Sequence, residues 1–85
     1  MNIKDIVLDT RELEAPEPMG VVLDNLKLLN ETTYILMIHR LEPQMLFVHL
    51  DRNNLNYKIT FKNEDIFIYI WDDSFKKKDM FKEMK

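Results

Sequence analysis

Three side chains of this sequence, His39, Glu42 and His49, have the types needed to bind a metal ion or to move a proton. Imidazole and carboxylate groups are common ligands of zinc and iron, and histidine can act as an acid or a base near neutral pH. His39 ends an apolar run and Glu42 follows it, so both are expected beyond the carboxyl end of a strand, where ligand sites often lie. His49 lies well inside the next expected helix, and no nucleophile accompanies His39. The pattern therefore favours surface or capping roles, with no catalytic residue, metal or cofactor.

The stretch LDTRELEAPEPMG, residues 8 to 20, contains a second group of candidates. Pro16 and Pro18 suit the first turn of a helix, where N–H groups are unpaired, and Glu17 is favourable at the positive end of the helix dipole. Such a helix start, with Arg11 nearby, could bind a small anion. The prolines remove donors and the acidic residues repel anions, so a rigid helix start is favoured. The candidate ligand-binding residues are thus Arg11, Glu17, His39, Arg40 and Glu42.

Two strands of alternating character, YKITFK (57–62) and DIFIYIW (65–71), predict a β-hairpin with an interaction face. A two-residue turn at Asn63 and Glu64 pairs Phe61 with Ile66, whereas a three-residue loop would exchange the two faces. With the shorter turn, the face away from the helices carries aromatic and lysine side chains, namely Phe67, Tyr69, Trp71, Lys58 and Lys62.

This aromatic face has more than one interpretation. Aromatic rings beside lysines could bind single-stranded RNA by stacking, but the formal charge of −3 gives no general attraction to polyanions, so nucleic acid is not an expected partner. An apolar patch on a small domain is more often a protein contact. We expect the apolar side chains of residues 74 to 85 to cover this face, in the same chain or a neighbouring copy, with a disordered tail as the alternative; they are Phe75, Met80, Phe81 and Met84.

The elements that position these groups follow from the hydrophobic pattern. Apolar runs at residues 6–9 and 32–39 predict two strands, of which the second is expected at the centre of the sheet. Helical spacing of apolar residues predicts one helix from the prolines at 16 and 18 to about Leu29 and another from Pro43 to about Arg52. With the hairpin, the order is βαβαββ. Short connections favour an α+β fold, a two-layer sandwich with two helices on one face of a four-stranded mixed sheet. Residues 1–72 form this domain, and residues 73–85 form a basic, amphipathic C-terminal tail.

Composition limits the function further. The chain has 85 residues, which is enough for one domain. A folded chain of this length buries only about 60 to 65 per cent of the surface that its unfolded state exposes, so we expect a partner or a second copy in a homodimer to cover apolar surface. Cysteine is absent, which excludes disulfides, thiolate catalysis and cysteine-bound metal. No segment approaches the roughly 18 apolar residues of a membrane span, and the N-terminus has no leader pattern, so we expect a cytoplasmic protein without membrane contact.

Two segments resemble a known family. LDTRELEAPEPM is similar to the start of the TusA/SirA-like sulfur carriers, small βαβαββ proteins with a Cys-Pro-x-Pro motif at the beginning of helix one; the matching residues are Leu8, Asp9, Arg11, Leu13, Pro16 and Pro18. Ala15 stands where that motif has its cysteine. The lack of cysteine, together with EPQMLF, resembles more closely a sister group, the domain of unknown function 2249, at Glu42, Pro43 and Leu46.

For the carriers, the resemblance implies a persulfide that is formed on the motif cysteine and passed to a partner. That chemistry needs a thiolate, which a helix N-terminus stabilises, and the methyl group of Ala15 cannot replace it. The leading interpretation is therefore a non-enzymatic protein that binds a protein partner or a small ligand. Two alternatives stay open: a metal- or His39-dependent small-molecule site, and RNA binding through the aromatic face.

Overall fold

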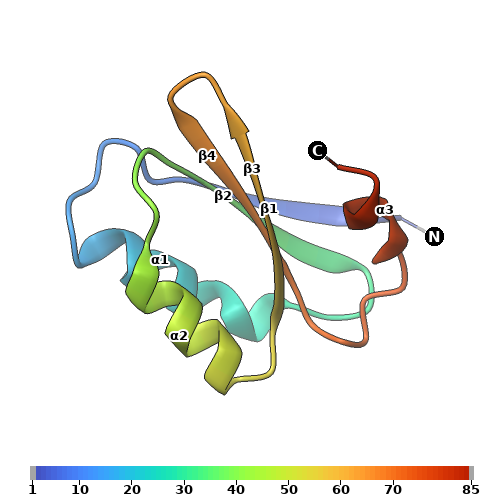
Figure 1. Ribbon diagram of the computed structural model, residues 1–85. Coiled ribbons are helices and arrows are strands. Elements are labelled where there is room, and N and C mark those ends of the chain that lie inside the picture. Colours follow the sequence, from blue (N-terminus) through green and yellow to red (C-terminus); the bar gives the residue numbers. More distant parts are fainter. Residues whose placement is uncertain (1, 85) are drawn as a thin grey trace.

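The computed structural model describes residues 2–84, so Met1 of the predicted domain and Lys85 of the predicted tail lie outside the described residues (Figure 1). Within this range, four strands form one sheet: β1 (Lys4–Asp9), β2 (Thr33–His39), β3 (Asn56–Lys62) and β4 (Asp65–Trp71). The helices are α1 (Glu17–Asn25), which a 3-10 turn, η1 (Leu26–Leu28), extends, then α2 (Gln44–Arg52) and the short α3 (Asp79–Lys82). The predicted α+β fold with a mixed sheet is confirmed. No helix among the described residues has the length and apolar character needed to cross a membrane.

The strand order in the sheet is β1-β2-β4-β3. β1 and β2 are parallel, with Lys4 opposite Thr33 and Asp9 opposite Ile38, whereas β4 runs antiparallel to both of its neighbours. A parallel pair needs a crossover connection, which α1 supplies. β2 has β1 on one side and β4 on the other, which confirms the prediction of a central strand and explains its continuous apolar sequence.

α1 and α2 cover one face of the sheet and enclose the main core between the two layers (Figure 1). Burying one valine, leucine, isoleucine or methionine side chain completely stabilises a fold by about 1.5–3 kcal/mol. The core residues with no exposed surface are Val22, Ile35, Met37, Leu46, Leu50, Ile68 and Ile70. Val22 of α1 and Leu46 and Leu50 of α2 pack in the same core as the strand residues. This packing fixes the position of both helices relative to the sheet.

The hairpin of β3 and β4 has the predicted two-residue turn. Phe61 pairs with Ile66, and Asn63 has a φ of 58°, a left-handed conformation that asparagine adopts more readily than most residues. The alternating isoleucines of β4 therefore face the helices and are buried. Phe61 is directed to the same face but is 64% exposed, near the end of its strand.

The C-terminal segment packs on the opposite face of the sheet, where α3 lies away from α1 and α2 (Figure 1). Phe75 and Phe81 are each 1% exposed, and the ring of Phe81 stacks on that of Trp71 with 4.0 Å between centroids. Tyr34 and Tyr69 also contact Phe81, at centroid distances of 5.3 and 5.7 Å. As far as residue 84, the segment covers part of the aromatic face of its own chain, as expected.

Candidate functional site

A cleft of about 810 Å3 lies where β1 and β2 end. Residues between Arg11 and Met19 line one side of it, and residues between His39 and Leu46 line the other. The two strands are parallel neighbours, so their carboxyl ends meet at the same edge of the sheet, and the connections to α1 and α2 diverge from there. Two segments about 25 residues apart in sequence, each of which contains predicted site residues, thus form one site.

Most of the predicted ligand-binding residues line this cleft. They are Arg11, His39, Arg40 and Glu42. Glu17 is exposed in the first turn of α1 and is outside the lining. His49, half-buried in α2, is also outside it, and within residues 2–84 no group of three or more histidine and acidic residues is arranged to hold a metal ion. The structure therefore does not combine His39, Glu42 and His49 into a ligand set.

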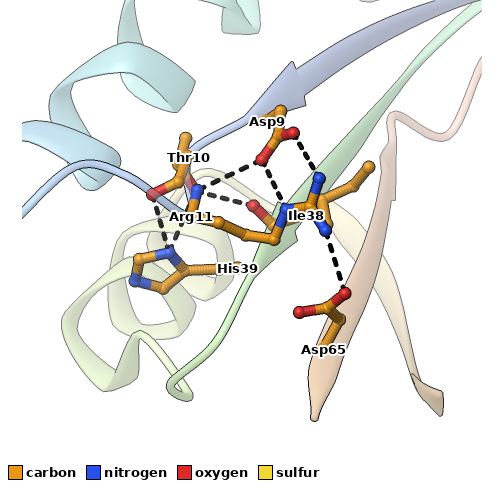
Figure 2. Close-up of polar contacts among 6 residues, drawn as sticks. All are labelled: Asp9, Thr10, Arg11, Ile38, His39 and Asp65. Atoms are coloured by element: carbon orange, nitrogen blue, oxygen red, sulfur yellow. Dashed lines mark hydrogen bonds and ion pairs between the residues drawn. The ribbon is translucent and has the colours of Figure 1, made fainter. Parts of the chain in front are cut away.

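Arg11 has a different role from the one its sequence position suggested. Its Nε and Nη2 donate to the two carboxylate oxygens of Asp9, at 2.9 and 2.7 Å, and its Nη1 donates to Oδ2 of Asp65 at 3.0 Å (Figure 2). The hydrogen bonds from the Arg11 side chain and backbone lower the pKa of Asp9 to about 2. The guanidinium thus links the end of β1 to the start of β4, and each of its three nitrogens already donates to a carboxylate.

The imidazole of His39, at the end of β2, is oriented by Thr10, which follows β1 and is 1% exposed. Nδ1 of His39 lies 3.1 Å from both the hydroxyl and the carbonyl oxygen of Thr10 (Figure 2). The same hydroxyl donates to the carbonyl oxygen of Ile38 at 2.9 Å, and so does the Thr10 backbone N–H. The imidazole therefore has a defined orientation at the edge of the cleft, although it is half-buried rather than enclosed.

The walls of the cleft are mostly apolar. Leu41 is 74% exposed and Met45 is 59% exposed, although both are large apolar residues. Side chains of this kind exposed at a concave site are typical of a contact surface. The principal apolar residues of the walls are Leu13, Pro16, Met19, Leu41, Pro43 and Met45.

Charged groups at the cleft balance one another. Arg11 and Arg40 are opposed by Glu14 and Glu42, so with neutral His39 the lining has no net formal charge. Ala15 also belongs to the lining, where its side chain is only a methyl group. The cleft can therefore accept an apolar group and offer hydrogen bonds, but its lining has no thiol, hydroxyl or amine to act as a nucleophile.

The aromatic face of the hairpin lies on the other side of the sheet from α1 and α2 (Figure 1). Lys58 pairs with Tyr69 and Lys62 with Asp65 across the two strands. Phe81 occupies a face of Trp71, and Phe67 lies further along β4 beside Ile38 of β2. Lys58 and Trp71 also line a second, smaller cavity of about 370 Å3 together with Phe81 and two lysines of the tail.

Sequence reasoning missed two residues that organise the cleft, Thr10 and Asp65. Thr10 gave a weak signal, a hydroxyl directly after a strand. Asp65 is 54 positions from Arg11 and gave none, because only the sheet order brings β4 close to the end of β1.

Searches against protein-family models, curated proteins and solved structures found no match to this chain.

Proposed function

We propose that this chain is a non-enzymatic binding protein that takes a small, neutral and largely apolar ligand in the cleft at the carboxyl ends of β1 and β2. The observation that carries the proposal is the combination of a volume of about 810 Å3 with apolar walls and balanced charges. Ligand sites of proteins commonly have volumes of about 300–1,000 Å3, apolar walls and a few polar groups. The exposed side chains of Leu41 and Met45 would lose water contact when such a ligand binds.

We also infer that the chain is a cysteine-less relative of the TusA/SirA-like proteins, nearest to the domain of unknown function 2249. The shared element order and the residues of the β1–α1 connection support this inference. The Asp9–Arg11 ion pair provides a physical reason for the Asp-x-Arg spacing, because Arg11 also pairs with Asp65 and so joins the end of β1 to the start of β4. With Ala15 in the cleft, binding would be retained without sulfur transfer.

RNA binding through the aromatic face has less support. Of the three aromatic rings of this face, Trp71 and Tyr69 contact Phe81, which leaves Phe67 as the one ring without such a contact in the described residues. For bases to stack on Phe81's side of Trp71 and Tyr69, the tail would have to leave the sheet, which would expose two buried phenylalanines.

The binding proposal is tested by titrating the isotope-labelled chain with para-propylanisole, a neutral and largely apolar probe, and recording amide NMR spectra. We expect shift changes centred on residues 11–19 and 39–46. Leu41→Asp should weaken binding about tenfold or more, because a carboxylate would have to lose water at the contact. Leu28→Asp is the matched control, since Leu28 is 47% exposed on η1 and outside the cleft.

Binding that is equally weakened by both substitutions would contradict the proposal. An absence of shift changes in the cleft would also contradict it.

A further inference from the structure

The contacts of His39 determine which of its two ring nitrogens carries the hydrogen. The carbonyl oxygen of Thr10 can only accept a hydrogen bond, and it lies 3.1 Å from Nδ1. The hydroxyl of Thr10 uses its own hydrogen on the carbonyl oxygen of Ile38, so toward Nδ1 it can also only accept (Figure 2). Both neighbours of Nδ1 are therefore acceptors, and the neutral imidazole must have its hydrogen on Nδ1.

The other ring nitrogen, Nε2, then has a lone pair and no hydrogen. It makes no hydrogen bond with any residue of the described range 2–84, and no side-chain nitrogen or oxygen in that range is both buried and without a partner. Nε2 is consequently not fully buried, and it belongs to a side chain that lines the cleft. Fixing a histidine through Nδ1 to a carbonyl oxygen is a common way to present Nε2 to a ligand.

The other polar side chains of the cleft, Arg11 apart, are exposed and are not oriented by a buried partner, as His39 is by Thr10; they are Glu14, Arg40, Glu42 and Gln44. The donors of Arg11 are engaged by Asp9 and Asp65, at 2.7 to 3.0 Å. Arg40 is exposed and lines the same cleft as the carboxylates Glu14 and Glu42, so an anionic ligand would gain little there. Nε2 of His39 is thus a polar group held in position by buried structure, and it offers an acceptor.

We propose that the cleft selects neutral apolar ligands that present an O–H or N–H donor to Nε2 of His39. This inference rests on the proposed binding function and deepens it by naming the ligand class. A phenol or an indole satisfies the requirement, whereas an ether of the same shape lacks the donor and a carboxylate brings an uncompensated charge.

Three probes with the same apolar body separate these cases: para-propylphenol, para-propylanisole and para-propylbenzoate. Each is titrated into the full chain and followed by amide NMR. We expect the phenol to bind about fivefold tighter than the anisole, which corresponds to one ordinary hydrogen bond, and the benzoate to bind no tighter than the anisole. If all three bind in the cleft without preference for the phenol, the donor requirement is wrong but the binding function stands. If none binds, the binding function itself fails.

His39→Phe keeps a ring but removes the acceptor. In this variant, we expect the phenol to bind no more tightly than the anisole, whatever the affinity of each probe for the altered cleft. A phenol preference that persists in the variant would overturn the assignment to His39.

A second measurement needs no variant and no ligand. Nitrogen NMR of the imidazole rings at a pH of about 9, where histidine is neutral, reports the tautomer directly. We expect hydrogen on Nδ1 for His39, while the ring nitrogens of His49, which make no hydrogen bond within residues 2–84, provide the internal comparison. Hydrogen on Nε2 of His39 would overturn the proposal.

Discussion

Arg11 and Thr10 are adjacent in sequence and organise opposite sides of the same strand end. Arg11 is directed toward β4 and forms ion pairs with Asp9 and Asp65, whereas the hydroxyl of Thr10 contacts Ile38 and His39 on β2. The two side chains alternate as expected for residues that continue an extended strand. As a result, three of the four strands are tied together at the edge where the cleft lies.

The ion pair of Asp9 predicts a specific dependence of stability on pH. The pKa of Asp9 is lowered from its ordinary value of 3.8 to about 2, chiefly by the side-chain hydrogen bonds from Arg11, so the folded state binds this proton less readily than the unfolded state. The pair therefore contributes stability above a pH of 3.8, and this contribution is lost as the pH falls through about 2. We expect Asp9→Asn to unfold at lower urea concentration than the native chain at neutral pH, and the difference to vanish near pH 2.

The matched control for this prediction is Asp24→Asn, because Asp24 is exposed on α1 and has no ion pair within residues 2–84. Its unfolding should follow the native chain at all pH values. If Asp9→Asn differs from the native chain by a constant amount down to pH 2, the ion-pair account is wrong.

At the scale of elements, the C-terminal segment acts as a partial third layer. It is joined to the rest of the fold by a backbone hydrogen bond from Lys76 to Glu31, at 2.8 Å, as well as by aromatic contacts. Phe75 and Phe81 pack edge to face against Tyr34, with centroid distances of 5.7 and 5.3 Å. A four-residue helix has little stability of its own, so α3 depends on these contacts with the sheet.

The contribution of this layer is tested by Phe81→Ala. Phe81 is 1% exposed, and removing a buried phenylalanine ring costs about 3–5 kcal/mol of unfolding free energy. Urea unfolding followed by the fluorescence of Trp71, the one tryptophan of the sequence, gives both the stability and the loss of the stacked ring.

Phe61→Ala is the matched control. Phe61 is 64% exposed near the end of β3, so this substitution should lower the unfolding free energy much less than Phe81→Ala. Equal losses in the two variants would mean that the segment does not pack on the sheet in solution.

For the molecule as a whole, the two faces of the sheet differ in how completely they are covered. α1 and α2 cover one face, and the C-terminal segment covers the other around Tyr34 and Trp71 (Figure 1). Away from that segment, Val7 remains 51% exposed on β1. The radius of gyration is 12.2 Å, close to the value of about 12 Å expected for a compact domain of this length.

Removal of residues 74 to 85 should therefore affect both stability and association. It takes away two buried phenylalanines and uncovers aromatic rings, so we expect a loss of about 5 kcal/mol or more of unfolding free energy and an increase in solution mass as copies associate through the exposed face. Chemical unfolding and light scattering measure the two effects.

A full-length chain with Phe75→Ser and Phe81→Ser keeps the charges of the tail and serves as the comparison. It should reproduce both effects if the aromatic contacts are responsible. Unchanged stability and mass in the truncated chain would contradict the role of the segment as a layer of the fold.

Much of the architecture could be predicted because it depends on patterns over a few residues. Alternation in residues 57–71 determined the hairpin and its faces, and the two-residue turn determined that Phe61 pairs with Ile66. The helix start after Pro16 followed from proline and acidic residues in the first turn. Four of the five candidate ligand-binding residues, chosen from their positions after strands or before helices, line one cleft.

By itself, the sequence determined the order of elements, the helix-facing side of each strand and the absence of thiol chemistry, because these depend on local patterns and on which atoms are present. The tertiary structure decided that Arg11 pairs with Asp65, that Thr10 orients His39 and that Glu17 lies outside the cleft. These relations join residues up to 54 positions apart and arise only when β1, β2 and β4 take their order in the sheet. That order results from burying the whole core at once, which no local pattern encodes.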